Sequence, residues 1–193
     1  MIVLGNGESR KRLNITALGD SIIGCNAIVR DTMVDSVVCC DKRMVKEALT
    51  TTVKKIYTRK RWFNGWNDDR VCELPELPYK GTDRRDESIH WGSGPYAVLL
   101  GAKRAETIYL AGFDLYGIGD RLNNIYKDTV NYKNSGDSKI DPSYWIYQIG
   151  KVFEIYSKRE FVILQPKDWE QPNNWKLPNV KVDNKRYYKY NTL

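Results

Sequence analysis

The chain has 193 residues, of which 41% are hydrophobic, enough for one α/β domain with a proper core and too little for two. No stretch approaches the roughly 18 apolar residues of a membrane span, and the first residues resemble a core strand rather than a charged leader, so we expect a cytoplasmic protein. The four cysteines, Cys25, Cys39, Cys40 and Cys72, show no CxxC spacing. The sequence therefore predicts neither a disulfide framework nor a zinc site.

The net charge is +7, and part of the excess is concentrated in one short segment that contains Lys54, Lys55, Arg59, Lys60 and Arg61. Such a run is typical of a solvated basic face. It also favours an anionic partner such as phosphate, a nucleotide or a nucleic acid.

The first third of the chain predicts strands separated by one helix. Residues 1–6, 21–29 and 35–41 are short, rich in β-branched side chains, and closed by Gly, Asn or Asp. Residues 44–53 carry apolar side chains at helical spacing, and residues 54–62 predict a fourth strand flanked by charge.

Regular patterns stop between residues 63 and 88, which we expect to form an irregular insertion, either a long loop or a pair of short strands. They return at residues 92–105, where Pro95 suits a first helical turn and the apolar run behind it predicts a buried helix. Residues 106–117 then predict a strand, followed by a polar loop to about residue 140.

A second long helix is predicted after this loop, with Asp141 as its cap and Pro142 as its first residue. Residues 160–166 form the last predicted strand. We expect residues 1–165 to be a Rossmann-like nucleotide- or nucleotide-sugar-binding domain, and residues 166–193 to be an aromatic and basic extension packed on it.

Alternating strands and helices predict an α/β fold, with a mostly parallel sheet covered by helices on both faces in a single domain. In such sheets ligands bind at the carboxyl ends of the strands. The polar residues that close the predicted strands are therefore candidate binding residues, and they are Asn6, Asn26, Asp41 and Asp114.

The opening glycine turn is a candidate phosphate site. A strand running into Gly5, Asn6, Gly7 and Ser9 can turn sharply and bring backbone amides close to a ligand. It is not a dinucleotide fingerprint, because Arg10 stands where the third glycine is needed. An ordinary tight turn between a strand and a helix is the alternative.

Two further features point to the same edge. The side chain of Asn26 must satisfy both an amide and a carbonyl, and either a nucleotide or the neighbouring backbone can do so. Ser93 and Gly94 lie where a helix begins and predict a second amide-rich anion site, although Ser93 also fits a simple helix cap.

His90 is the only histidine, and it is a candidate base or phosphate ligand, although a lone histidine is more often structural. Asp114 and Tyr116 end the strand at residues 106–117 and supply a carboxylate and a phenol. No metal-binding constellation stands out, so we predict no metal site.

Three separated motifs then carry a family resemblance. "VLGNGES", "GCNAIVRD" and "IHWGSGPYAVLLGAKRAETIYLAGFDLYG" resemble the bacterial lipooligosaccharide sialyltransferases of glycosyltransferase family 42. They are more loosely similar to flagellin glycosylation factors and hydroxymethylpterin diphosphokinases. The resemblance implies a GT-A-like Rossmann variant that binds a CMP-activated sugar without a metal or other cofactor and transfers the sugar with inversion.

The resemblance also implies roles for residues in the binding site. Asn6 and Ser9 would lie near the donor phosphate, and Asn26 would contact the nucleotide. Ser93 and Gly94 would hold the donor as well.

By the same resemblance Asp114 would bind the ribose or base, while Tyr116 and Tyr126 would stabilise the departing phosphate. The family's general base is a histidine in the loop after these tyrosines, and this chain has none there. His90, or a carboxylate such as Asp120 or Asp128, is then left for that role.

The function we predict is therefore a metal-independent glycosyltransferase that transfers a sugar from a CMP-sugar type of donor to an acceptor hydroxyl. The basic, aromatic-rich segments favour a nucleic-acid base as the acceptor. Two alternatives stay open: an ATP-dependent diphosphotransferase like the pterin enzymes, and a non-catalytic nucleotide or nucleic-acid binding protein.

Overall fold

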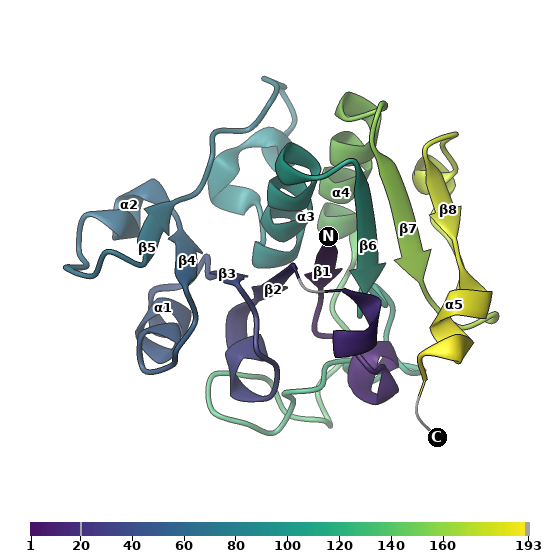
Figure 1. Ribbon diagram of the computed structural model, residues 1–193, viewed down its shortest axis with the longest axis horizontal. Helices are drawn as coiled ribbons and strands as arrows, with labels where there is room; N and C mark the ends of the chain where they lie inside the picture. The colour runs from purple at the N-terminus through teal and green to yellow at the C-terminus, as the bar shows by residue number, and fades with distance from the viewer. Residues whose placement is uncertain (20, 192–193) are drawn as a thin grey trace.

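The structure, a computed structural model, describes residues 1–19 and 21–191. It contains an eight-stranded sheet in the order β5-β4-β3-β2-β1-β6-β7-β8, and each neighbouring pair of these strands is parallel (Figure 1). The strands are β1 (Ile2–Leu4), β2 (Ile22–Cys25), β3 (Ser36–Val38), β4 (Lys55–Thr58), β5 (Val71–Glu73), β6 (Thr107–Ala111), β7 (Glu160–Leu164) and β8 (Val180–Val182).

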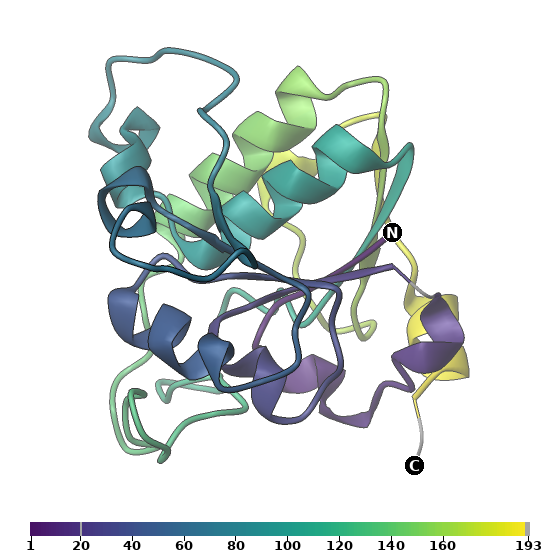
Figure 2. The same ribbon diagram turned by 60° about the vertical axis from the view of Figure 1, so that its left-hand side comes forward.

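Helices cover both faces of this sheet. They are α1 (Lys42–Leu49), α2 (Lys60–Phe63), α3 (Ser93–Arg104), α4 (Ser143–Ile155) and α5 (Asn184–Lys189). The pair α3 and α4 lies on one face, and α1 and α5 lie on the other (Figure 2). The predicted α/β fold with a parallel sheet between two helical layers is confirmed.

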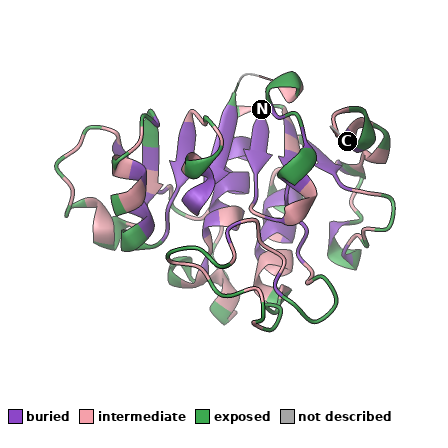
Figure 3. Cartoon of the chain, turned by 90° about the horizontal axis from the view of Figure 1, so that it is seen from below, coloured by how far each residue is buried: buried purple, intermediate pink, exposed green. Residues whose placement is uncertain are grey.

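The central strands are apolar throughout because both of their faces are buried. In β1, Val3 packs into the core cluster under α3 and α4, while Ile2 and Leu4 pack into the cluster on the side of α1. Figure 3 shows this burial in the middle of the sheet, while exposed residues lie on the loops and on the outer sides of the helices.

Several element boundaries differ from the prediction. The strand expected at residues 21–29 ends at Cys25, because Asn26 has φ +52° and begins a 3₁₀ helix over Asn26–Arg30. The strand expected at residues 54–62 ends at Thr58, and its basic continuation coils into α2.

The segment 166–193 contributes to the sheet itself. Its strand β8 pairs in parallel with β7, and the sequence analysis did not predict it. Only three residues form β8, too few for a visible alternation of polar and apolar side chains.

In the described part of the chain, no helix combines the length and the apolar character needed to cross a membrane.

The strand order fixes where a ligand site is expected. The chain moves outward from β1 through β2 to β5 on one side, then returns to place β6 against the other edge of β1. Such a reversal opens a crevice beyond the carboxyl ends of the two central strands. The loops that follow β1 and β6 lie at this point.

Candidate functional site

A cavity of about 320 Å³ lies at this reversal. The turn after β1, the turn before α3 and the loops after β2, β3 and β6 all contribute to its wall. The two glycine turns of the sequence analysis therefore face one another across a single cavity.

Most of the predicted binding residues line this cavity. They are Gly5, Asn6, Gly7, Asn26, Asp41, Ser93, Gly94 and Asp114. Ser9 does not line the cavity. Its hydroxyl and its main-chain amide both donate to the carboxylate of Asp114, which does line it.

Ser93 joins three elements of the wall. Its hydroxyl donates to the carboxamide oxygen of Asn26 across 2.9 Å and accepts from the amide of Cys40 across 3.0 Å. The side chain does not cap α3, whose N-cap is Gly92. The helix-cap alternative for Ser93 is therefore wrong, because its hydroxyl is bonded to residues that follow β2 and β3 instead.

Asn26 holds a left-handed backbone conformation, with φ +52°. Asparagine tolerates this region better than most residues, and such backbone is concentrated at ligand sites. The turn aims the carboxamide across the cavity wall toward Ser93. Among the residues that the structure describes, the amide nitrogen of this side chain has no hydrogen-bond partner, so it can donate to a ligand.

The first turn of α3 is the part of the cavity wall whose geometry suits an anion. This helix has 12 residues and begins in the wall with Ser93, Gly94 and Pro95. Its first amides point out of the helix without intrahelical partners, and the helix dipole adds positive potential. The geometry fits a phosphate group.

In the opening glycine turn, two main-chain amides are engaged within the protein. The amide of Gly5 donates to the carbonyl of Ala111 across 2.8 Å, and that of Gly7 donates to the carbonyl of Gly112 across 2.9 Å. Both glycines are required by this close packing, since a Cβ on Gly5 would lie 2.3 Å from the oxygen of Gly112. The amides of Gly5 and Gly7 thus hold the end of β6 and the loop after it, and the prediction that this turn binds a phosphate stays a prediction.

Asn6 is the residue of this turn that faces the cavity with polar atoms. Its amide nitrogen donates to the carbonyl of Cys25 across 3.2 Å and to the hydroxyl of Tyr132 across 3.3 Å. Its carboxamide oxygen is buried and has no partner within the described residues. An unpaired buried acceptor is rare in folded proteins, and a donor on a bound ligand would satisfy it.

Asp114 is 8% exposed, and neighbouring hydrogen-bond donors stabilise its carboxylate. The carboxylate accepts from the amide and hydroxyl of Ser9 and, across 3.1 Å, from the side chain of Gln165. A carboxylate with these partners can be buried without a cation. Asp114 therefore fixes the shape of the wall.

The three predicted catalytic side chains are not brought together in the cavity. His90 lies outside its wall and accepts a hydrogen bond from Nε of Arg84 across 3.2 Å. Tyr116 faces a separate hollow beside Lys139. Tyr126 is buried, where its hydroxyl accepts from Arg10 across 2.6 Å and donates to Asp31 across 2.9 Å.

These placements follow from local packing. The phenol of Tyr126 belongs to a buried network, and burial raises its pKa.

Asp120 and Asp128, the two carboxylates considered as alternative bases, also lie outside the cavity wall. Asp120 has a side chain 98% exposed and paired with Lys139, while hydrogen bonding from Ser135 lowers the pKa of Asp128.

The loop at residues 117–140 supplies residues that the sequence analysis missed. Asn123, Asn124 and Tyr132 line the cavity from this loop, and Trp145 and Ile149 line it from α4. Nothing in the local pattern marks the loop residues, because their contacts with the turn after β1 span more than 100 positions.

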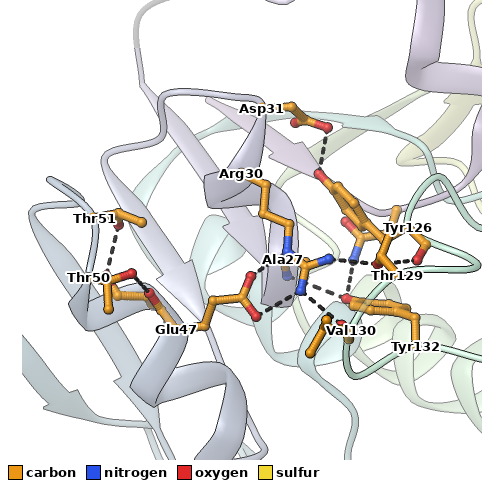
Figure 4. A network of polar contacts seen from close by, with 12 residues as sticks. Ala27, Arg30, Asp31, Glu47, Thr50, Thr51, Tyr126, Thr129, Val130 and Tyr132 are labelled. Carbon is orange, nitrogen blue, oxygen red and sulfur yellow. Dashed lines mark hydrogen bonds and ion pairs between the residues drawn. The ribbon is translucent and has the colours of Figure 1, made fainter.

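Arg30 fixes this loop to the body of the protein (Figure 4). Its guanidinium pairs with Glu47 of α1 and donates to the hydroxyl of Thr129 and the carbonyl of Val130 across 2.7 and 2.9 Å. The same group lies 5.7 Å from the ring centre of Tyr132. We call this set the Arg30 clamp.

The basic segment is divided by the fold. Lys54 and Lys55 lie where β4 begins, and Lys54 pairs with Asp35 across 2.9 Å. Arg59, Lys60 and Arg61 follow the other end of the strand. The five cations do not form one face.

Arg59 is the member of this segment that reaches the cavity wall. Its guanidinium donates to the carbonyls of Cys40, Ser88 and Trp91 across 3.2, 2.7 and 2.6 Å. It thereby ties the end of β3 to the segment that leads into α3.

Cys25 and Cys40 also line the cavity. Burial raises the pKa of the Cys25 thiol to about 12 and raises that of Cys40 as well, so these thiols are poor nucleophiles. Within residues 1–19 and 21–191, no three His, Cys, Asp or Glu side chains are grouped closely enough to hold a metal ion.

Several solved structures with a similar fold are sialyltransferases. The monofunctional alpha-2,3-sialyltransferase Cst-I from Campylobacter jejuni gives a TM-score of 0.56 at 17% identity, over 91% of this chain and 78% of that one. CST-II in complex with a trisaccharide acceptor and CMP gives 0.51 at 14%, over 99% of both chains. CstII from Campylobacter jejuni with cytidine-5'-monophosphate gives 0.56 at 16%, over 86% and 79%.

At these identities the likeness establishes the fold, and it confirms the fold that the family resemblance implied. No protein-family model matches the sequence, and no curated protein matches it either.

Proposed function

We propose that this protein is a glycosyltransferase whose cavity binds a nucleotide-activated sugar of the CMP-sugar type. The observation that carries the proposal is the convergence of the first turn of α3, the carboxamide of Asn26 and the unpaired oxygen of Asn6 on one cavity at the reversal of strand order. These groups offer a phosphate site and hydrogen-bonding partners for a polar ligand within one enclosure.

The structural neighbours support this choice of ligand. One neighbour is a sialyltransferase in complex with CMP and a trisaccharide acceptor, and another is in complex with cytidine-5'-monophosphate. A fold alone does not define an activity, so the proposal rests on the wall of the cavity, and the neighbours narrow the ligands to be tested first.

In the proposed reaction the acceptor hydroxyl displaces the nucleoside phosphate from the sugar carbon. Negative charge then grows on the leaving phosphate, and donors fixed beforehand around it lower the barrier. We assign this role to the amides of Ser93 and Gly94 at the start of α3. The roles of His90, Tyr116 and Tyr126 stay predictions, since none of these side chains lines the cavity.

The nucleic-acid acceptor also stays a prediction. The comparisons give it no support, and the basic segment is split between the two ends of β4. The two alternatives, a diphosphotransferase and a non-catalytic binding protein, share the same cavity and differ in what they bind and turn over.

A titration by calorimetry with CMP, UMP, GMP, ATP and CMP-N-acetylneuraminic acid tests the proposal, with and without Mg²⁺. We expect CMP to bind without Mg²⁺ and Asn26→Ala to weaken it by about tenfold or more. Binding of ATP alone, and only with Mg²⁺, would favour the diphosphotransferase. Binding of CMP without slow hydrolysis of any sugar nucleotide would favour the non-catalytic protein, and failure of every nucleotide to bind would refute the proposal.

A further inference from the structure

The start of α3 offers few main-chain donors to a bound phosphate. Among the first residues of this helix, Pro95 has no N–H, and the amide of Tyr96 donates to the carbonyl of Gly92 across 3.3 Å. This leaves the amides of Ser93 and Gly94 for a ligand. A phosphate group carries three strong acceptor oxygens, so these two amides satisfy only part of it.

Trp145 places a side-chain donor beside these amides. It lies in the first turn of α4, which packs next to α3 on the same face of the sheet (Figure 2), and it lines the cavity together with Ile149. A Cβ on Gly92, the N-cap residue of α3, would lie 3.4 Å from Nε1 of Trp145 and 3.7 Å from its Cδ1. The N–H edge of the indole therefore lies next to the residue at which α3 begins.

The indole N–H of Trp145 has no partner within the protein. Among the residues that the structure describes, no group accepts a hydrogen bond from its Nε1. The side chain is half-buried, and its nitrogen, unlike those of Trp62 and Trp66, is not sealed from solvent. A ligand in the cavity can therefore reach this donor.

The other tryptophans show how this chain treats an indole that only packs. Three of them donate to a main-chain carbonyl across 2.8 or 2.9 Å, and these are Trp91, Trp169 and Trp175. Such pairing is usual for a buried indole. Trp62 and Trp66 have no partner, but they lie outside the cavity wall. Of the six tryptophans, Trp145 is the one that lines the cavity.

From this arrangement we infer that Trp145 is a phosphate-binding residue, whose indole N–H donates to the phosphate group of the nucleotide at the start of α3. The inference rests on the proposed function and adds a side chain to its main-chain phosphate site. An indole N–H is a donor only, so Trp145 holds the phosphate and takes no part in proton transfer. A hydrogen bond to a charged acceptor is stronger than one between neutral groups, so the contact favours ligands that carry the phosphate.

Trp145→Phe tests this role, because it keeps an aromatic ring in the wall and removes the N–H. Calorimetry compares CMP with cytidine, which lacks the phosphate. We expect the variant to bind CMP more weakly than the wild-type protein does, by about tenfold or more. Its affinity for cytidine should stay within about threefold of the wild-type value, because the lost bond is to the phosphate.

Trp66→Phe is the matched control. It also removes an indole N–H that has no partner, but at a position outside the cavity wall. This variant should bind CMP with wild-type affinity. Circular dichroism checks that both variants are folded.

A measurement on the wild-type protein does not depend on either variant. In protein labelled with ¹⁵N-tryptophan, each indole N–H gives its own NMR signal, and that of Trp145 is assigned by its nuclear Overhauser effects to Gly92. We expect saturating CMP to move the proton resonance of Trp145 downfield, as a new hydrogen bond to a phosphate oxygen does, and cytidine to leave it in place.

Wild-type affinity for CMP in Trp145→Phe would overturn the inference, as would a resonance of Trp145 that saturating CMP leaves unmoved. Equal losses of affinity for CMP and cytidine would overturn it too, because the side chain would then contact the nucleoside. In each case CMP binds the wild-type protein, so the proposed function stands. Absence of CMP binding by the wild-type protein would instead count against the proposed function itself, and this inference would fall with it.

Discussion

The hydroxyl of Tyr132 lies 3.3 Å from the side-chain nitrogen of Asn6 and 3.4 Å from the main-chain nitrogen of Ala27. A loop residue thereby reaches the ends of β1 and β2, more than 100 positions earlier in the chain. Burial raises the pKa of this phenol, so at neutral pH it stays an uncharged group that completes the cavity wall. The Arg30 clamp is bonded to the same loop through Thr129 and Val130.

Breaking the clamp should loosen the loop without unfolding the sheet. In Arg30→Ala the loop loses its bonds to Thr129 and Val130 and its connection to Glu47. We expect amide hydrogen exchange across residues 121–132 to accelerate by about tenfold or more, while exchange in β1 and β6 stays slow. Hydrogen exchange measured by mass spectrometry checks both halves of this expectation.

Arg43→Ala is the matched control, because Arg43 lies exposed on α1 and contributes nothing to the clamp. It should exchange like the wild-type protein. If Arg30→Ala also leaves the loop protected, the contacts of Asn123 and Tyr132 hold the loop by themselves and the clamp is dispensable.

The clamp should also give the stability a defined pH dependence. Hydrogen bonding from Arg30 lowers the pKa of Glu47 below its ordinary value of 4.5. A carboxylate with a lowered folded-state pKa stabilises the fold above the unfolded value and loses that contribution as the pH falls through the folded value. The stabilisation by Glu47 is therefore complete above pH 4.5 and disappears in more acidic solution.

Glu47→Gln tests this by urea unfolding at several pH values. At pH 7 we expect the variant to be less stable by about 1 kcal/mol, since both partners are about three-quarters buried and the contact is bidentate. The difference should shrink as the pH falls below 4.5. Glu76→Gln, which changes an exposed carboxylate, should show no such trend. A difference that is constant with pH would mean that the charge of Glu47 is irrelevant.

The glycines of the first turn are required by packing, and this gives a prediction about stability. A Cβ at Gly5 would lie 2.3 Å from the main-chain oxygen of Gly112, which cannot move away as a side chain would. Gly5→Ala should lower the free energy of unfolding by about 2 kcal/mol or more, as measured with urea.

Gly136→Ala is the control, because a Cβ there meets nothing within 4 Å. Its stability should stay within about 1 kcal/mol of the wild-type value. Equal stability of Gly5→Ala and the wild-type protein would show that the turn can widen, and its amides would then be free to reach a ligand after all.

The sequence was sufficient to predict where the cavity lies and insufficient to predict its details. Parallel strands place their carboxyl ends at one edge, so Asn6, Asn26 and Ser93 were brought together by topology that the alternating pattern already specifies. The use of the Gly5 and Gly7 amides could not be predicted, because it depends on how closely β1 and β6 approach.

The contacts of the loop at residues 117–140 could not be predicted for a related reason. Tyr132 contacts Asn6, and its loop is bonded to Arg30, which pairs with Glu47 on another element. Such a contact leaves no local periodicity in the sequence. The strand β8 could not be predicted because its three residues are too few to show a pattern of their own. It is defined by its pairing with β7.

The backbone and the side chain of Asn26 can be separated by experiment. Its φ of +52° is strained for alanine and free for glycine, so Asn26→Ala should be less stable than Asn26→Gly by about 1 kcal/mol. Both variants lose the carboxamide and its bond to Ser93. We therefore expect both to bind CMP more weakly by about tenfold or more, although Asn26→Gly keeps the turn. Urea unfolding measures the first effect and calorimetry the second. Wild-type affinity in Asn26→Gly would show that this position serves the turn alone and that the ligand does not touch its carboxamide.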